Sequence, residues 1–465
     1  MTTKERILKK VPEDKTYLFE SAPVPKAVMS LAIPAVLSQL VSLVYNMTDT
    51  FFIGRLGDPD QVAAVSLAAP LMLALTALSN LFGIGAAGTA SRFIGAKEDD
   101  SAKRATAFGF YTALAIAAVL SVLALFFTGF FLDILGAAGN TRKNTGDYLF
   151  WVFIAGGIPS LLSMVLSHFI RTDGAPKTAS FGLSMGGILN IVIDPLLIFD
   201  FGFGLGIKGA AIGTFTANMF TLAYFLRYFY ISRKNTVVSL DPRWYTVRRE
   251  ITGQVFITGL PGMLQTLLAS VSNTVLNQLA IGFGSEAVAA LGIVKKIDTI
   301  PMSVTIGVAQ GVMPLLGYNY AAKNERRVRN SVKFALLPTV GFSLLCVAAF
   351  QLFTPLFIGL FIKESVTVSH GVFFLRVMCV STPLMAVGFI MITLFQAAGA
   401  GKPALILSVL RKGLVDIPLM LLLNLLYPLI GLAYVQPVTE LAAMSAAAVL
   451  YIRFFRKTGE KRAVD

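Results

Sequence analysis

Acidic side chains inside long apolar stretches are the feature of this 465-residue chain that most needs a chemical explanation. An ionisable group at membrane depth costs about 2.5–3.5 kcal/mol on insertion scales, so it needs either a partner or a function. Asp194 lies inside the stretch 179–200, and Asn190 precedes it by four residues, which places both side chains on one helical face. Asp49 closes the charge-free stretch 27–48. Both carboxylates are therefore candidate functional groups.

Each aspartate also has a structural interpretation. The Asp194-Pro195 step can break a helix, and the carboxylate can then cap the broken turn. Asp49 stands close to the predicted membrane edge, where it can hydrogen-bond Arg55 or a loop amide. For Asp194 the structural and functional interpretations are compatible.

The elements that must position these residues are membrane-spanning helices. Hydrophobic residues make up 55% of the chain and charged residues 14%, and the mean hydropathy is +0.73, which is far from the composition of a soluble domain. Apolar stretches long enough to cross a hydrocarbon core of ~30 Å recur throughout. They predict twelve helices, six before residue 233 and six after 250, over 27–48, 62–91, 105–132, 148–170, 179–200, 207–230, 251–285, 299–322, 334–362, 377–401, 417–439 and 431–455.

The hydrophobic pattern occurs twice along the chain. The segment 31–67 reappears as 257–293, and 191–199 reappears as 414–422. Each half has an even number of helices, so the second half enters the membrane from the same side and the repeats are parallel. Two such halves are typical of a carrier, because the cleft between them can open to either side in turn. The predicted fold class is an all-α polytopic membrane protein with 12 transmembrane helices in two parallel, pseudo-symmetric six-helix lobes.

Two prolines occupy matched positions in the repeats. Pro34 lies in the first predicted helix and Pro261 in the seventh. Each proline frees a backbone carbonyl one turn earlier and weakens its helix there. We therefore predict that both are hinges.

The basic residues predict the orientation. Most of the 39 Lys and Arg residues fall in the terminal segments and in the loops on the same side of the membrane. Loops on the opposite side hold only five, which are Arg55, Arg142, Lys143, Lys208 and Lys363. This bias predicts a multi-pass protein of the inner or plasma membrane with both termini in the cytoplasm. It also accounts for the net charge of +14 without the basic face of a soluble nucleic-acid-binding domain.

The predicted organisation has five parts. They are a cytoplasmic tail (1–25), a first lobe (26–232), a cytoplasmic linker (233–250), a second lobe (251–456) and a second cytoplasmic tail (457–465). The first 25 residues are polar and interrupted by proline, so they predict a tail and not a cleavable signal peptide.

Motifs of other functional classes are missing from the sequence. It has no phosphate-binding GxxxxGK[ST] loop, which argues against ATP as the energy source and against an ATPase subunit. It has no nucleophile–base set, so we do not expect an enzyme, and no cofactor is implied. His168 and His370 lack metal-ligand spacing, and Cys346 and Cys379 are expected to be small core residues.

Three segments resemble the multidrug and toxic compound extrusion (MATE) transporters. They are TDTFFIGRLGDPDQVAAVSLAAP (48–70), GIGAAGTASRFIGAKEDDSAKRA (83–105) and FIRTDGAPKTA (169–179), the last echoed by LFQAAGAGKPA (394–404). The resemblance runs from about residue 26 to 456 in one register. It implies a carrier of amphipathic small molecules in the lipid bilayer. A self-contained pair of six-helix lobes needs no partner chain, so we expect a monomer.

The resemblance also implies a coupling-ion site in the first lobe. In transporters similar to this chain, a cluster of the same composition holds the ion, and it corresponds here to Asp49, Asn190, Asp194 and Thr214. Four hard oxygen ligands can bind Na⁺, whereas a carboxylate removed from water can take up and release a proton. The sequence leaves both ions open and implies no other metal.

The second half carries charges of a different kind. It has no acid in the predicted helix 251–285, where some MATE branches are thought to bind Na⁺, and this favours the first-lobe site. Its buried bases are expected to pair with Asp298, Asp416 and Glu440 in a structural network. The alternative is that Lys296 and Arg411 face the cavity and contact an anionic part of a substrate.

Methionine side chains are the remaining cavity candidates. Most of the 15 Met residues are expected to face lipid or to pack, but Met185 and Met263 can line a cavity that adapts to varied ligands. The predicted function is therefore antiport, driven by H⁺ or Na⁺, of amphipathic and mainly cationic drugs and toxic compounds. The alternatives are a lipid-linked saccharide flippase or an exporter of an anionic metabolite, and, less compatible with a two-lobe repeat, a channel or receptor.

Overall fold

The computed structural model describes residues 17–462, and all its regular elements are helices. The predicted tails 1–25 and 457–465 therefore lie outside the described residues over 1–16 and 463–465. Ten helices are long and apolar enough to cross a membrane, and a bent pair brings the number to up to 11. The chain is thus a polytopic membrane protein, as the composition predicts.

The first half contains six membrane segments. They are α3 (Val24–Arg55), the run of α4 (Pro59–Ser79), η1 (Asn80–Ile84) and α5 (Gly85–Gly95), α6 (Asp99–Phe126), the bent run of α8 (Gly139–Leu149), η2 (Phe150–Ile154) and α9 (Gly157–Thr172), α10 (Pro176–Ile198) and α11 (Ile207–Ser232). The short helices α2 (Tyr17–Glu20) and α7 (Thr128–Ile134) lie outside them.

The second half repeats this order. Its segments are α12 (Arg249–Ile281), α13 (Ser285–Ala321), α14 (Glu325–Leu352), the run of α16 (Ser365–Met378), η4 (Cys379–Ser381) and α17 (Thr382–Ala397), the run of α18 (Gly401–Val409), η5 (Leu410–Leu414) and α19 (Asp416–Leu426), and α20 (Ile430–Arg462). A short helix follows both the third and the ninth segments, namely α7 and α15 (Thr354–Gly359). The repeat in the sequence is therefore also a structural repeat.

The prediction for the eleventh helix is wrong. A single helix over 417–439 was expected, but α19 ends at Leu426 and α20 begins at Ile430. Pro428 lies in the turn between them, and Leu429 adopts a positive φ of 63°. The eleventh segment instead begins at Gly401 and carries three charges in its middle, so a search for charge-free stretches missed it.

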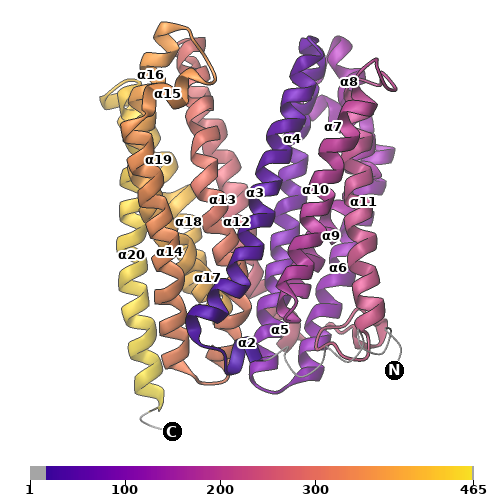
Figure 1. Cartoon of the computed structure of the whole chain (residues 1–465), viewed down its shortest axis with the longest axis vertical. Helices are drawn as coiled ribbons and strands as arrows, with labels where there is room; N and C mark the ends of the chain where they lie inside the picture. The colour runs from indigo at the N-terminus through magenta and orange to yellow at the C-terminus, as the bar shows by residue number, and fades with distance from the viewer. Residues whose placement is uncertain (1–16, 463–465) are drawn as a thin grey trace.

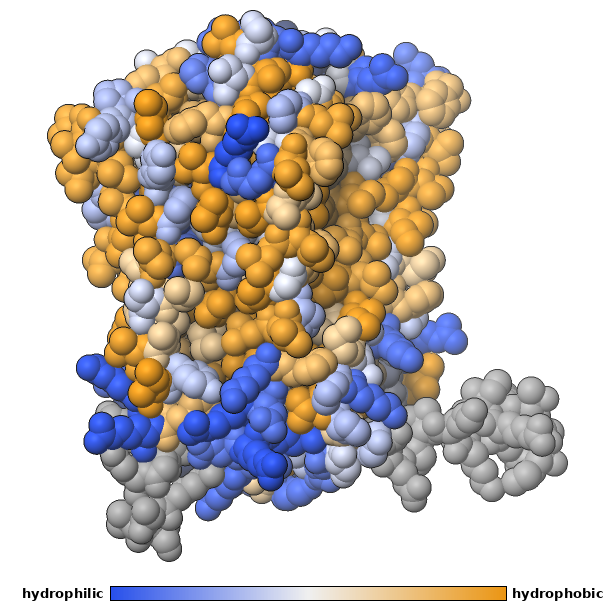
Figure 2. All heavy atoms as spheres, turned by 60° about the vertical axis from the view of Figure 1, so that its left-hand side comes forward, coloured by the Kyte–Doolittle hydropathy of each residue, from blue (hydrophilic) through white to orange (hydrophobic). Residues whose placement is uncertain are grey.

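The two lobes meet on one side of the molecule. Figure 1 shows the two groups of helices close together at the end that holds α2 and the end of α20, and apart at the opposite end. We call these ends the termini side and the far side. Figure 2 shows a broad apolar band with hydrophilic belts at both ends, as expected for a protein surrounded by lipid.

The first helix of each half packs against both lobes. On the termini side, Gly311 of α13 lets the backbone of α3 approach at Leu31, because a Cβ on Gly311 would lie 2.6 Å from the Leu31 carbonyl oxygen. Farther along α3, Val41 packs against Gly187 of α10. Helix α12 repeats this arrangement, with η1 and α5 of the first lobe against its first half and η5 of its own lobe farther along. Both helices continue through their internal prolines, Pro34 and Pro261, so hinge motion at these prolines stays a prediction.

Arg92 of α5 makes several hydrogen bonds across the contact between the lobes. Its Nη1 donates to the carbonyl oxygens of Gln396 and Ala397, each at 3.2 Å. Its Nη2 donates to the Thr258 hydroxyl at 3.1 Å and to the Gln254 side-chain carbonyl at 3.3 Å. One guanidinium thus joins the first lobe to two membrane segments of the second.

The lobes separate beyond the middle of the membrane. The interlobe hydrogen bonds nearest the far side join Gln39 to Gln310 and Asn80 to Thr266, near the midpoints of their helices. Past this level, Asn46 of α3 is exposed, and so is its repeat counterpart Asn273 of α12. A polar side chain in a membrane helix normally faces protein or water and not lipid. Among the described residues, hydrogen bonds thus join the lobes up to the level of Gln39 and Asn80, whereas the polar side chains of Asn46 and Asn273 are exposed beyond it.

Replacing Gly259 with alanine should destabilise this lobe contact. An ideal Cβ on Gly259 would lie 1.9 Å from the Leu81 carbonyl oxygen, so the two helices would have to move apart. Overpacking of this kind costs about 1–3 kcal/mol, and we expect a lower thermal unfolding midpoint. Gly253→Ala on the same helix is the control, because its Cβ has no neighbour within 4 Å. Equal unfolding midpoints for the two variants would contradict this prediction, because they would show that the two helices can accommodate a methyl group at this contact.

Helix α2 joins both lobes on the termini side. Glu20 accepts hydrogen bonds from Lys97 of the first lobe and from the Tyr318 hydroxyl of the second. The Phe19 carbonyl oxygen accepts from Arg327 Nε at 2.8 Å and from Asn319 Nδ2 at 3.0 Å. The described end of the predicted N-terminal tail is therefore part of the lobe contact.

Glu20→Gln should remove a small, pH-dependent part of the stability. Hydrogen bonds from Lys97, and then from Tyr318, hold the pKa of Glu20 below its usual 4.5. Because the pKa is lower in the folded state, this contribution is complete above pH 4.5 and is lost as the pH falls through the folded pKa. The pair is solvent-exposed, so we expect about 1 kcal/mol or less. Unfolding midpoints of wild type and variant should differ at pH 7 and converge in acid, and a constant difference would point to another cause.

The predicted linker 233–250 packs against α6. The Tyr111 hydroxyl donates to the Leu240 carbonyl oxygen at 2.7 Å. Lys103 places its ammonium group 5.0 Å from the centroid of the Trp244 ring. These contacts hold the connection between the halves on the first lobe.

Candidate functional site

The paired side chains predicted in the first lobe are buried together in α10. Asn190 Nδ2 donates to Asp194 Oδ1 at 2.9 Å, and each residue is 1% exposed. The spacing of four residues along a helix accounts for this contact, so the predicted shared face is confirmed. Helix α10 continues through Pro195 to Ile198.

Two glycines bring the neighbouring helices close to this pair. A Cβ on Gly213 of α11 would lie 2.1 Å from Asp194 Oδ1, so only glycine leaves room for the carboxylate. A Cβ on Gly187 would lie 3.2 Å from Val41 Cγ1 of α3, one helical turn before Tyr45. The pair therefore lies where α10 meets both α3 and α11.

The site has oxygen atoms without hydrogen-bond partners. Among the described residues these include the buried atoms Asp49 Oδ1, Asn190 Oδ1 and Asp194 Oδ2. Leaving buried acceptors unsatisfied costs about 1–3 kcal/mol each. Three such atoms in one lobe form a set of oxygens that can accept a proton or a small cation.

Asp49 is half-buried on α3. The structural interpretation allowed a hydrogen bond between Asp49 and Arg55, but Arg55 contacts a different side chain. Arg55 lies over the ring of Phe51, with 5.5 Å between the guanidinium carbon and the ring centroid. A Cβ on Gly187 of α10 would lie 3.7 Å from Tyr45 Cβ, so α3 meets α10 one helical turn before Asp49.

Tyr45 was not among the site residues predicted from the sequence. It precedes Asp49 by four residues and so shares its helical face, a signal that was available in the sequence. Its place near Gly187 depends on how α3 packs against α10, which the sequence does not reveal.

Thr214 follows Gly213 on α11 and is half-buried. Within the described part of the chain, its hydroxyl makes no hydrogen bond with Asp49, Asn190 or Asp194. The structure thus brings Asn190 and Asp194 together, with Asp49 on the neighbouring α3 and Thr214 beside the glycine that touches Asp194.

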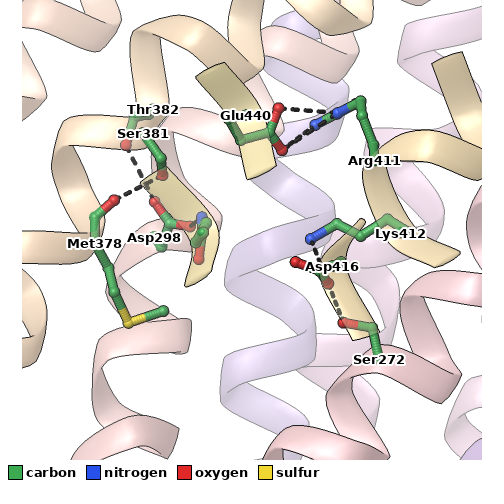
Figure 3. Close-up of polar contacts among 10 residues, drawn as sticks. Ser272, Asp298, Met378, Ser381, Thr382, Arg411, Lys412, Asp416 and Glu440 are labelled. Atoms are coloured by element: carbon green, nitrogen blue, oxygen red, sulfur yellow. Dashed lines mark hydrogen bonds and ion pairs between the residues drawn. The ribbon is translucent and has the colours of Figure 1, made fainter. Parts of the chain in front are cut away.

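Two acids of the second lobe are paired with bases, as Figure 3 shows. Arg411 binds Glu440 through two nitrogen atoms, with Nη2 to Oε1 at 2.7 Å and Nε to Oε2 at 3.0 Å, and both side chains are 1% exposed. Lys412 lies 3.8 Å from Asp416, which also accepts from the Ser272 hydroxyl. The predicted structural network is present for these two acids.

Asp298 has neutral partners instead. It accepts from Thr382 Oγ1 at 3.3 Å and from Gln436 Nε2 at 3.1 Å. No base lies within ion-pair distance of it in the described residues, so the expected pairing with a base is absent there. The amide and the hydroxyl supply donors to the carboxylate without a second charge.

The four predicted cavity residues have different surroundings. The alternative in which Arg411 faces the cavity is wrong, because its guanidinium is buried against Glu440 and the Phe389 ring. Lys296 is exposed. Met185 is half-buried on α10, and Met263 packs against the hydrophobic core that residues of both lobes form.

Comparisons with known proteins agree with this architecture. The MatE family model matches residues 34–196 and 261–422, which is the same part of each half. Multidrug export protein MepA of Staphylococcus saprophyticus is 31% identical over 450 residues, or 97% of this chain and 98% of that protein. MepA of Staphylococcus aureus strain MRSA252 is 32% identical over 441 residues, or 95% of this chain and 96% of that protein.

Solved structures show the same fold. One is the outward-facing conformation of a multidrug resistance MATE family transporter of the MOP superfamily, with a TM-score of 0.87 and 25% identity over 97% of this chain and 100% of that chain. Another is a MOP superfamily transporter from Pyrococcus furiosus whose binding pocket has reverse polarity, with a TM-score of 0.86 and 25% identity over 96% and 98%. The chain therefore belongs to the MatE family, the family of the MATE transporters.

Proposed function

We propose that this transporter exports amphipathic, mainly cationic drugs and toxic compounds in exchange for H⁺ or Na⁺. Export of varied drugs is supported by similarity to the MepA multidrug export proteins. Ion coupling is supported by one observation above all, the buried Asn190–Asp194 pair with its unpaired oxygen atoms. A buried carboxylate with free lone pairs suits an ion that binds and leaves in every cycle.

The distribution of basic residues supports one orientation of the transporter in the membrane. If the termini side is cytoplasmic, as the excess of Lys and Arg there indicates, the two lobes of this structure stand apart toward the outside of a plasma or inner membrane. The similarity to a transporter described in an outward-facing conformation supports this assignment. In the opposite state the contacts of Arg92 and Glu20 would break, and the cleft would admit a drug from the cytoplasm or the inner leaflet.

The exchange follows from competition for the first lobe. A drug enters the inward-open cleft, the lobes reverse, and H⁺ or Na⁺ then binds near Asp49, Asn190, Asp194 and Thr214. Ion binding bends α3 at Pro34, narrows the cavity and expels the drug. A crosslink across this bend that leaves transport intact would contradict the last step.

Membrane energetics limit the stoichiometry. Moving one charge through 100 mV is worth about 2.3 kcal/mol. Exchange of one monovalent cation for one H⁺ moves no net charge, so only the ion gradient drives it. Export driven by the membrane potential itself needs at least two ions per drug cation.

The lipid-linked saccharide flippase gains no support from the buried bases. A pyrophosphate headgroup needs accessible cationic partners, but Arg411 is held by Glu440, and Lys412 lies beside Asp416. Lys296 is the exposed base among those that the sequence indicated. We therefore favour drug export, and we keep flipping and export of an anionic metabolite as outcomes of the test below.

The deciding experiment is ethidium uptake into inverted vesicles. We expect wild-type protein to concentrate ethidium under an imposed pH gradient or an imposed Na⁺ gradient, and the effective gradient identifies the coupling ion. Collapse of that gradient with an ionophore should release the dye. Folded protein that gives no uptake under either gradient would overturn the proposal and favour a lipid-linked or anionic substrate.

A further inference from the structure

The turn between α13 and α14 and the first turns of α14 carry a concentration of bases. Residues 323–333 contain five Lys and Arg residues but only one acid, Glu325. One of the bases pairs with Glu325, and another donates to the backbone of α2. The other three are exposed and have no acid within ion-pair distance in the described residues, namely Lys323, Arg326 and Lys333.

The repeat shows that the fold does not need these charges. Lys97 and Lys323 occupy equivalent turns, and both have a positive φ, of 64° and 59°. The eight residues from Lys97 (KEDDSAKR) contain three bases and three acids, whereas the eight from Lys323 (KNERRVRN) contain four bases and one acid. Both turns contact α2 on the termini side. The general excess of basic residues on that side therefore does not account for the difference between them.

A base at the start of α14 is also unfavourable for the helix itself. Helix α14 begins at Glu325, so Arg326 lies in its first turn, near the positive end of the helix dipole. Helix α6 carries Asp100 at the equivalent position, where an acid is stabilising. Bases that oppose the dipole and lack acidic partners indicate an anionic partner outside the chain.

The depth of these bases points to the membrane surface. On α14 the basic turns are followed by Leu337, which is 69% exposed. On α20, which runs in the opposite direction, Ile452 is 66% exposed and precedes the exposed Arg453. The two helices meet at this level, because the guanidinium carbon of Arg329 lies 4.2 Å from the centroid of the Phe455 ring. Both helices thus change from exposed apolar to exposed basic side chains where lipid headgroups lie.

The surface of the second lobe agrees with this placement. Figure 2 brings this lobe forward and shows hydrophilic side chains gathered at the termini end, next to the apolar band. An anionic phospholipid matches both parts of this surface, because it combines a negative phosphate group with apolar chains.

We propose that the exposed bases of α14 and α20 bind the phosphate group of an anionic phospholipid in the leaflet on the termini side. Arg326 and Lys333 are seven residues apart, so they share a face of α14, and Arg453 supplies a charge from α20. The acyl chains then lie along the exposed Leu337 and Ile452. This inference goes beyond the proposed export function and depends on neither the substrate nor the coupling ion.

The test measures lipid binding to the purified protein in detergent. Native mass spectrometry compares the affinities for phosphatidylglycerol and for phosphatidylcholine with the same acyl chains, and inorganic phosphate is added as a competitor. We expect wild type to prefer phosphatidylglycerol and inorganic phosphate not to displace it. Arg326→Gln/Lys333→Gln should lower this preference by about 5-fold for each base removed. The control Arg233→Gln/Lys234→Gln removes two exposed bases on the termini side of the first lobe and should leave the preference unchanged.

Thermal unfolding separates the loss of the site from a folding defect. Without lipid, Arg326→Gln/Lys333→Gln should have an unfolding midpoint at least equal to that of wild type, because it removes a base from the first turn of α14. Added phosphatidylglycerol should raise the midpoint of wild type more than that of this variant. Arg326→Lys/Lys333→Arg keeps both charges and should behave as wild type.

Several results would overturn the site. They are equal affinities of wild type for the two lipids, a preference that survives in Arg326→Gln/Lys333→Gln, and an equal loss in the control variant. Displacement of the lipid by inorganic phosphate would instead show a site for a soluble anion. None of these results bears on drug export, which the ethidium measurement tests separately.

Discussion

Asp194→Asn should abolish gradient-driven accumulation and leave the folded protein intact. Each coupled proton can support about 10-fold accumulation per pH unit, because one pKa unit corresponds to 1.36 kcal/mol. Asparagine cannot carry the proton or the negative charge that Na⁺ needs, so the variant should only equilibrate ethidium across the vesicle membrane. Its amide can still hydrogen-bond Asn190, which now donates to Asp194 at 2.9 Å. We therefore expect an unfolding midpoint at least equal to that of wild type.

The control for this variant is a carboxylate outside the membrane segments. Asp133 on α7 is 68% exposed in an ion pair with Arg142, so Asp133→Asn should leave uptake unchanged. Asp49→Asn should reduce coupling, since Asp49 supplies another of the unpaired buried oxygen atoms. If Asp194→Asn still concentrates ethidium under a gradient, the coupling ion binds elsewhere and the first-lobe site is wrong.

Hydropathy predicted most of the fold because each lipid-facing segment must be apolar along its whole length. The stretch 207–230 corresponds to α11, and 27–48 lies within α3. The failure at 417–439 has a physical cause. A membrane segment can carry Arg411, Lys412 and Asp416 when their charges are neutralised inside the lobe, and the partner Glu440 lies on another helix. A search for charge-free stretches therefore excluded a real segment.

The candidate site was predictable as far as one helix determines it. Asn190 and Asp194 share a face because of their spacing, and the structure confirms their hydrogen bond. The approach of α3, which carries Asp49, to α10 depends on Gly187. No periodicity in the sequence encodes such a contact. The resemblance to MATE transporters suggested the grouping, whereas the close contacts at Gly187 and Gly213 are visible only in the structure.

Charge pairing in the second lobe was also only partly predictable from the sequence. The sequence placed Glu440 and Arg411 within or near membrane segments and predicted a network of charges. It did not show which base pairs with which acid. Arg411 was also a candidate for a substrate contact, and its bidentate bond to Glu440 argues against an exposed role. Asp298, which was expected to meet a base, is satisfied by Thr382 and Gln436. Which side chains pair across two helices depends on how the helices pack against each other, and the sequence alone does not show this.

Glu440→Gln should destabilise the protein strongly, because it leaves the Arg411 guanidinium buried without a counter-charge. Breaking a buried ion pair from one side typically costs about 3–5 kcal/mol. Arg411→Met should cost a similar amount, since Glu440 would then be the uncompensated charge at 1% exposure. Unfolding midpoints of the purified variants measure both effects. A control is Glu325→Gln, which breaks a pair with Arg329 near the termini side and should lower the midpoint far less.

The double variant Arg411→Met/Glu440→Leu separates a structural pair from a transport residue. Replacing both charges with apolar side chains of similar volume is often neutral or stabilising, so the midpoint should recover. If the pair only holds α20 against the eleventh segment, gradient-driven ethidium uptake should recover with it. A stable double variant that fails to transport would instead show that these charges act in the cycle. The second lobe would then contribute more than a scaffold, and the first-lobe carboxylates would not be the whole coupling machinery.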